Sequence, residues 1–97
     1  MSYSLLVEKK KVKEYLDSLQ DDRRERHIDN LQQLSNHPYP GDGPGDKKQI
    51  KARDISNKLF RIRSGDYRGI YRISEREETV YVLNFGRKED IEPKYGP

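Results

Sequence analysis

Hydrophobic and polar residues alternate in the second half of the chain with the period of a β-strand. In residues 59–63, Phe60 and Ile62 alternate with Leu59, Arg61 and Arg63, and a similar alternation follows in residues 67–73. Successive side chains of a strand point to opposite faces of a sheet. Residues 79–85, which are rich in valine and aromatic residues, predict a further strand. This half of the chain therefore predicts a twisted antiparallel sheet of about three to four strands.

The first half of the chain changes to helical spacing after an initial strand over residues 3–7. Apolar residues recur on one side of two predicted helices, at Val12, Tyr15, Leu16 and Leu19 and then at Ile28, Leu31 and Leu34. Proline and glycine in residues 38–46 end the second helix, and residues 49–54 are expected to add a short extended piece. We expect an antiparallel helical hairpin whose apolar stripes face the sheet. The prediction is one α+β domain over residues 1–97.

The length of the loop between the two central strands decides which side chains share a face. With an even number of loop residues, the apolar side chains of both strands lie together, whereas an odd number would place each beside an arginine. We therefore expect the even register. One face then holds Phe60, Ile62, Tyr67 and Tyr71, and the opposite face holds Arg61, Arg63, Arg68 and Arg72. We expect the four guanidinium groups to form one exposed basic surface, with Arg68 exposed among them.

The charge of the chain is distributed unevenly between its two halves. Residues 1–46 carry 7 basic and 9 acidic side chains, and residues 47–97 carry 13 and 8. Like charges on neighbouring strands destabilise a sheet, and the two central strands carry no carboxylate on their arginine face. Solvation of an open sheet face would explain these arginines without any function. A bound polyanion would instead supply the missing negative charge, and the asymmetry favours a localised anion-binding surface.

The composition removes several classes of chemistry. Without cysteine the chain has no thiolate metal site, and we expect its two histidines, His27 and His37, to be surface residues rather than ligands. The glycines of residues 38–46 lack the lysine and hydroxyl residue of a phosphate-binding P-loop. No segment has the apolar length of a signal peptide core or a membrane span. We expect a cytoplasmic protein that uses neither a metal nor another cofactor.

Arginine, lysine and tyrosine remain as candidates for chemistry on phosphate. When the 2′-hydroxyl of an RNA chain attacks its own phosphodiester, negative charge grows on the oxygens around phosphorus. The planar guanidinium group binds two of these oxygens at once, and it stabilises the transition state more than the ground state. Tyr95 is a candidate general base or acid. The alternative for Tyr95 is an aromatic residue of the C-terminal tail that takes no part in chemistry.

One continuous part of the chain, residues 59–88, carries motifs that resemble a known family. They are the strand pair around Arg61 and Asp66-Tyr67-Arg68, the following Tyr71, the strand from Val80 to Phe85, and Gly86-Arg87-Lys88. In these motifs the chain resembles the RelE/ParE superfamily of toxins from toxin–antitoxin systems, and especially its RelE-like members. The resemblance implies the RelE-like microbial RNase fold. It also implies a ribosome-dependent mRNA endoribonuclease, or mRNA interferase, that cleaves A-site codons by 2′-hydroxyl attack and so inhibits translation. A cognate antitoxin protein would neutralise the toxin in a hetero-oligomeric complex.

The resemblance also implies roles for single residues. Matching by position gives a catalytic set of Arg61, Arg68, Lys88 and Tyr95. Arg61 takes the place of a strand lysine that supports the transition state, and Arg68 that of an arginine that stabilises it or protonates the leaving group. Tyr95 corresponds to a C-terminal tyrosine that stacks on the base or helps to deprotonate the nucleophile. Leu59 stands where some members have a second catalytic lysine. The expected RNA-binding residues are Lys47, Lys48, Lys51, Arg63, Arg72 and Arg87.

Two other functions fit the same residues. ParE-like toxins share the fold, lack the catalytic set and inhibit DNA gyrase. A non-catalytic module would use the basic sheet only to bind RNA or an acidic protein. Retention of Arg61, Arg68, the Arg87-Lys88 pair and Tyr95 favours RNA cleavage.

Overall fold

The computed structural model of this chain describes residues 2–50 and 58–96, and within them it contains helices and a five-stranded sheet. The strands are β1 (Ser4–Val7), β2 (Asp46–Ile50), β3 (Leu59–Ser64), β4 (Tyr67–Ser74) and β5 (Thr79–Arg87). The helices are α1 (Lys10–Ser18), α2 (Asp21–Gln32), the short 3₁₀ helix η1 (Gln33–Ser35) and α3 (Lys88–Tyr95). The predicted α+β class and the order of strand, helical hairpin and sheet are confirmed. None of the described helices is long and apolar enough to cross a membrane.

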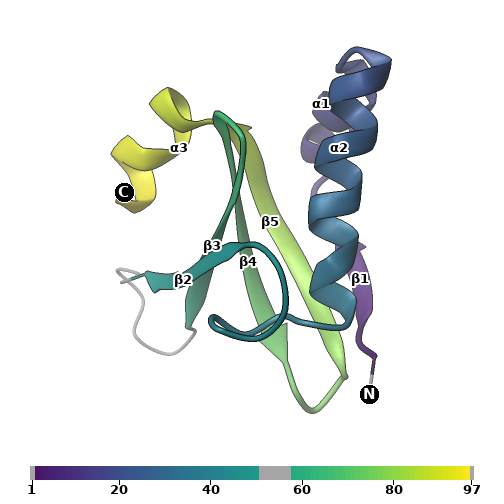
Figure 1. Cartoon of the computed structure of the whole chain (residues 1–97), viewed down its shortest axis with the longest axis vertical. Helices are drawn as coiled ribbons and strands as arrows, with labels where there is room; N and C mark the ends of the chain where they lie inside the picture. Colours follow the sequence, from purple (N-terminus) through teal and green to yellow (C-terminus); the bar gives the residue numbers. More distant parts are fainter. Residues whose placement is uncertain (1, 51–57, 97) are drawn as a thin grey trace.

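The sheet has the strand order β1-β5-β4-β3-β2. Strands β2 to β5 pair antiparallel with their neighbours, as the alternating pattern predicts. The initial strand β1 adds a fifth member at one edge, and it runs parallel to β5. A parallel pair needs a long crossover connection, and the helices and the rest of the sheet lie between these two strands in the sequence. The result is a mixed sheet with helices on both faces (Figure 1).

The β3–β4 hairpin has the even register that we expected. Its turn consists of two residues, Gly65 and Asp66, and Gly65 has a φ of +59°, a conformation that glycine adopts without strain. Arg63 is therefore the cross-strand partner of Arg68, and Phe60 is the partner of Tyr71. The apolar and the basic side chains are separated onto opposite faces of the hairpin.

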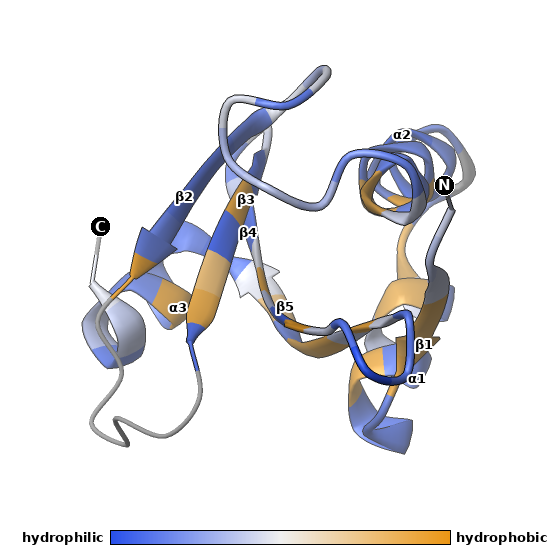
Figure 2. Ribbon diagram, turned by 90° about the horizontal axis from the view of Figure 1, so that it is seen from below, coloured by the Kyte–Doolittle hydropathy of each residue, from blue (hydrophilic) through white to orange (hydrophobic). Residues whose placement is uncertain are grey.

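Helices α1 and α2 cover the apolar face of the sheet (Figure 1). The main core on this face includes Leu16, Leu31, Ile62 and Val82, all of them buried. Figure 2 shows that the hydrophobic residues of α2 gather on one side of a largely hydrophilic helix, which is the predicted amphipathic pattern. Gly69 leaves room for this packing, since a Cβ atom there would lie 3.0 Å from Cγ2 of Ile62.

Two elements shape the opposite face of the sheet. Strand β2 begins at Asp46, three residues before the extended piece that was expected over residues 49–54, and residues 51–54 of that piece lie outside the described part. The tail forms α3, a helix of 8 residues that contains Pro93. Ile91 of α3 packs with Ile50 and Ile70 in a second, smaller core. This packing places α3 over the basic side of the sheet.

Candidate functional site

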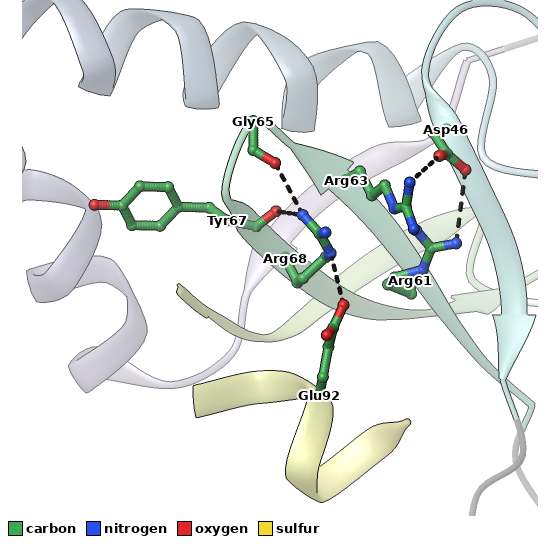
Figure 3. Close-up of polar contacts among 7 residues, drawn as sticks. All are labelled: Asp46, Arg61, Arg63, Gly65, Tyr67, Arg68 and Glu92. Carbon is green, nitrogen blue, oxygen red and sulfur yellow. Dashed lines mark hydrogen bonds and ion pairs between the residues drawn. The ribbon is translucent and has the colours of Figure 1, made fainter. Parts of the chain in front are cut away.

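Three arginines share the face of the sheet that α3 partly covers. Arg61 and Arg63 come from β3, and Arg68 comes from the facing position of β4. We call Arg61, Arg63 and Arg68 the arginine face (Figure 3). The two-residue turn and the period of two of the strands bring them together, as the sequence predicted. Their mutual repulsion is offset by carboxylates that the two strands do not supply, because Asp46 comes from β2 and Glu92 from α3.

Arg61 is almost completely buried, with 4% of its surface exposed. Its Nη2 lies 3.6 Å from Oδ1 of Asp46. Among the residues that the structure describes, the buried Nε and Nη1 of Arg61 have no hydrogen-bond partner. Burial lowers the pKa of Arg61, and the neighbouring guanidinium groups of Arg63 and Arg68 lower it further against the opposing effect of Asp46. Arg61 is thus a buried cation with two donor atoms that the described residues leave without an acceptor, which makes it a favourable partner for an anion.

Arg68 is buried as well, with 6% exposed, and the expectation of an exposed side chain is wrong. Its Nη1 donates hydrogen bonds of 2.9 Å to the carbonyl oxygens of Gly65 and Tyr67, and its Nε donates to Oε2 of Glu92 at 3.3 Å (Figure 3). The sequence pattern predicted a sheet face open to solvent, whereas α3 places the carboxylate of Glu92 against it. Arg68 is therefore held in place by contacts from both its own hairpin and α3.

The other two arginines of the predicted basic surface differ in position. Arg63 is half exposed and pairs with Oδ2 of Asp46 at 3.4 Å. Arg72 lies four residues along β4 from Arg68, about 13 Å at the rise of a strand. There it lies over the ring of Tyr81, 3.9 Å from the ring centroid, and pairs with Glu8 at 3.3 Å. The expected group of four is thus a group of three, with Arg72 apart from it.

Of the lysines expected to bind RNA, Lys47 is buried on the helical side of β2 and Lys48 is exposed. The ammonium group of Lys47 donates hydrogen bonds to the carbonyl oxygens of His37 and Asp42, at 2.6 and 2.5 Å. Burial lowers the pKa of Lys47. The ammonium group of Lys47, of which RNA binding was expected, thus holds the loop before β2. Lys48 is the cross-strand partner of Arg61, and Lys51 lies outside the described residues.

Of the C-terminal residues of the predicted site, Arg87 lies on the helical side of the sheet, whereas Lys88 and Tyr95 belong to α3. Arg87 is the cross-strand partner of Tyr67, whose ring belongs to the main core under the helices. A hydrogen bond with Tyr67 raises the pKa of Arg87. Lys88 begins α3, is exposed, and donates its backbone N–H to the carbonyl oxygen of Asp66 at 2.9 Å. Tyr95 is partly buried against the small core that also contains Ile70.

His27 shows a role that sequence reasoning missed. Only 4% of it is exposed, so the expectation of a surface histidine is wrong, whereas the side chain of His37 is partly exposed. The Nδ1 atom of His27 is hydrogen bonded to the hydroxyl of Ser64, which accepts a hydrogen bond from Asn30. Burial lowers the pKa of His27, and the nearby Arg26 and Arg23 lower it further. Its spacing from Leu31 and Leu34, which continue one apolar stripe from α2 into η1, was the available signal.

The two carboxylates that pair with the arginine face, Asp46 and Glu92, were not predicted as part of the site. Asp46 directly precedes the lysines of β2, but nothing in the sequence pattern marks Glu92 as a partner of Arg68. In residues 2–50 and 58–96, no three histidine, aspartate or glutamate side chains are placed to hold a metal ion. The arrangement can therefore act on a ligand through charge, hydrogen bonds and stacking by the groups described above.

Comparison with known proteins points to one family. A sequence model described as the ParE toxin of the type II toxin–antitoxin system parDE matches residues 8–92. Among solved structures, the archaeal RelE–RelB complex of Pyrococcus horikoshii contains a chain that is 25% identical, with a TM-score of 0.74 over 91% of this chain and 97% of that one. Among curated proteins, none matches this chain in sequence.

Two further solved structures share the fold. The toxin–antitoxin complex RelBE2 of Mycobacterium tuberculosis contains a chain that is 20% identical, with a TM-score of 0.68 over 90% of this chain and 92% of that one. A mutant of the E. coli toxin RelE in the free state is 23% identical, with a TM-score of 0.60 over 95% of this chain and 90% of that one. These likenesses confirm that the sheet and its helices have the RelE-like arrangement.

Proposed function

Because the chain belongs to the ParE toxin family of type II toxin–antitoxin systems, we propose that it is a toxin whose arginine face cleaves messenger RNA on the ribosome. The toxin enters the ribosomal A site, cuts the codon bound there and so inhibits translation in the cytoplasm. A cognate antitoxin protein binds it in a hetero-oligomer, as in the RelE–RelB and RelBE2 complexes that share its fold. The proposed partners are thus the antitoxin, the ribosome and mRNA.

The observation that carries this proposal is the state of Arg61 beside Arg68. Both guanidinium groups are buried, yet Nε and Nη1 of Arg61 have no partner among the described residues. A buried donor without a partner costs about 1–3 kcal/mol, and a charged one costs more. A phosphodiester group offers two anionic oxygens to a guanidinium fork, so its binding removes this cost.

The proposed reaction needs charge stabilisation and two proton transfers. The 2′-oxygen forms a bond to phosphorus while the bond from phosphorus to the 5′-oxygen breaks, which leaves a 2′,3′-cyclic phosphate and a 5′-hydroxyl end. One proton leaves the 2′-hydroxyl and one reaches the departing 5′-oxygen. We assign the developing charge to Arg61 and Arg68, since their positions are fixed before the reaction begins.

The remaining residues are proposed to bind the substrate or assist the proton transfers. Tyr95 is the proposed general base or stacking residue, and Lys88 the proposed cation at the start of α3. The exposed Lys48 and Arg63 are proposed to bind the RNA backbone beside the catalytic pair. Arg72, Lys51 and Arg87 are proposed as more distant contacts.

Two observations favour a second function. The sequence model that matches this chain is that of ParE rather than RelE toxins. In addition, Arg68 is already paired with Glu92, so that part of the arginine face is occupied by the chain itself. Under this alternative the toxin inhibits DNA gyrase and the arginine face binds its target without cleaving it.

Mapping of mRNA ends by primer extension separates these functions. Translation reactions with and without ribosomes would contain the wild-type toxin, Arg61→Lys or Arg68→Lys. Each lysine retains the positive charge but lacks the planar fork, so we expect cuts within A-site codons to fall by at least tenfold. Arg76→Gln, in the exposed β4–β5 turn, serves as the control and should cut as the wild type does.

The pattern of outcomes identifies the function. Cuts that require both the ribosome and the two arginines support the nuclease. Arrested growth without cuts, together with inhibited DNA supercoiling by purified gyrase, would overturn it in favour of gyrase inhibition. RNA binding with neither cuts nor gyrase inhibition would indicate a non-catalytic module. Circular dichroism of each variant distinguishes loss of activity from loss of fold.

A further inference from the structure

A second basic cleft lies on the helical side of the β3–β4 turn, away from the arginine face. Its volume is about 510 Å³. The residues that line it are Arg23, Arg26, His27, Gly65, Asp66, Tyr67, Arg87 and Glu89. We call this the α2 cleft. Figure 3 shows Tyr67, which lines the cleft, extending away from Arg61 and Arg63, so the cleft and the arginine face are separate places.

Three guanidinium groups converge on the α2 cleft from two elements. Arg23 and Arg26 are three residues apart and lie on one side of α2, and Arg87 comes from the end of β5. Among the described residues, none of these three arginines has a carboxylate oxygen within 4.0 Å of its guanidinium nitrogens. Asp66 and Glu89 also line the cleft and offset part of its charge. In the described part of the chain, three cations therefore face two carboxylates of the cleft without a direct ion pair.

The position of Arg23 is unfavourable for the helix itself. Arg23 lies in the first turn of α2, where the positive end of the helix dipole repels a cation, and Arg26 follows one turn later. The charges of Arg26 and Arg23 also add to burial in lowering the pKa of His27. A bound anion would relieve both effects.

Tyr67 gives the cleft a rigid wall with a polar tip. Its ring stacks on Phe85 at a centroid separation of 5.7 Å and an interplanar angle of 9°, and the ring of His27 lies 4.5 Å away. The guanidinium of Arg87 lines the same cleft, and like any arginine in a protein it is charged. A charged fork and a rigid phenol on one cleft offer donors to phosphate oxygens.

We propose that the α2 cleft binds a phosphodiester group of RNA, at a site separate from the arginine face. The choice of RNA as the ligand rests on the proposed function. Gly65 connects the two places, since its carbonyl oxygen accepts a hydrogen bond from Arg68 while the same residue lines the cleft. One RNA strand that crosses this two-residue turn contacts both sites. The cleft therefore extends the grip on the polyanion beyond the nucleotide that is cut.

The test compares two double variants of equal charge in the full-length chain. Arg23→Gln with Arg26→Gln removes two cations of the cleft. Arg24→Gln with Arg76→Gln removes two cations outside it, because Arg24 pairs with Asp17 and Arg76 lies in the β4–β5 turn. Binding is measured by fluorescence anisotropy with a labelled single-stranded oligoribonucleotide of about 12 nucleotides, at several salt concentrations. A polyglutamate peptide of similar length serves as a second probe.

The expected result is a loss of RNA affinity of about tenfold in the cleft variant, with a salt dependence of log K that is shallower by about 1.4. The control variant should stay within about threefold of the wild type. Equal losses of RNA affinity in both double variants would show that only the net charge of the protein matters, and this result would overturn the proposal. A loss of polyglutamate binding with unchanged RNA binding would also overturn it, and would assign the cleft to an acidic protein segment.

These outcomes are independent of the nuclease test. If the wild-type toxin cuts A-site codons while the cleft variant keeps full RNA affinity, only the cleft proposal fails. If no cuts occur but the cleft variant loses RNA affinity, the cleft stands as an RNA site and the nuclease proposal fails. Thermal unfolding of both double variants controls for their folding.

Discussion

The Nε atom of Arg68 lies 3.3 Å from Oε2 of Glu92, so a buried arginine of the arginine face is paired with a carboxylate of the last helix. Two further hydrogen bonds from Arg68 go to carbonyl oxygens of its own hairpin. Glu92 therefore sets part of the charge that an incoming anion meets. Four predictions follow from this contact and from the other buried polar groups.

Replacing Glu92 by glutamine should strengthen RNA binding. Glutamine keeps an acceptor for Arg68 but removes a negative charge beside the arginine face, so we expect affinity for a labelled oligoribonucleotide to rise several-fold at low salt. The free energy of unfolding, measured by urea denaturation, should fall because the amide oxygen is a weaker acceptor than the carboxylate. The fall should be only about 1 kcal/mol, since this side chain is partly exposed. Asp90→Asn, an exposed change on the same helix, is the control. An equal gain from both variants would show that Glu92 has no special influence.

Truncating Arg68 to alanine should destabilise the fold. The change leaves the carbonyl oxygens of Gly65 and Tyr67 and the carboxylate of Glu92 without their donor, and we expect a loss of about 2–3 kcal/mol. Arg63→Ala, on the same face but half exposed, should cost no more than about 0.5 kcal/mol. Urea denaturation of both variants measures the difference. Equal losses of stability in the two variants would mean that the contacts of Arg68 contribute nothing. Because Arg68→Ala is expected to destabilise the fold, the nuclease test uses Arg68→Lys instead.

Replacing Lys47 by methionine should weaken the fold without weakening RNA binding. Methionine retains an apolar stem but cannot donate to the carbonyl oxygens of His37 and Asp42, so we expect a loss of about 2 kcal/mol. Lys48→Met should show the opposite pattern, with near-normal stability and reduced affinity for the oligoribonucleotide, since Lys48 is exposed beside Arg61. Reduced RNA affinity in Lys47→Met at unchanged stability would contradict the structural role.

Stability should fall as the pH decreases below about 6.5, and His27 should cause this fall. Its pKa in the folded state is lowered, so between that value and about 6.5 the unfolded chain binds more protons than the folded one. Stability therefore rises with pH through this window and levels off above it. Urea midpoints measured from about pH 5.5 to 7.5 should lose this dependence in His27→Gln and keep it in His37→Gln. A dependence that survives in His27→Gln would exclude His27 as its source.

Local patterns were sufficient to predict the helical hairpin, the strands β1 and β3 to β5, and the register of the β3–β4 hairpin. The alternation around Phe60 and Ile62 indicated strands, and Gly65-Asp66 made the turn that keeps apolar residues on one side. Such features depend on neighbours in the sequence, so they can be read without knowledge of the fold. For the same reason the sequence brought Arg61 and Arg68 to one face correctly.

The burial and the partners of those arginines were decided by contacts between distant segments. Glu92 reaches Arg68 because Ile91 anchors α3 on the small core, and Asp46 reaches Arg61 because β2 pairs with β3. Arg87 lies on the helical side of the sheet because it pairs with Tyr67, and this position could not be predicted from the sequence.

The sequence by itself determined β1, the helical hairpin, strands β3 to β5, the hairpin register and the face on which three arginines gather, since each follows from a short-range period of polar and apolar residues. Tertiary structure alone decided that Arg61 and Arg68 are buried cations and that Lys47 is hydrogen bonded to the loop before β2. It also formed the α2 cleft from α2 and β5. Burial and ion pairing depend on which surfaces pack together, and that packing is a property of the whole chain.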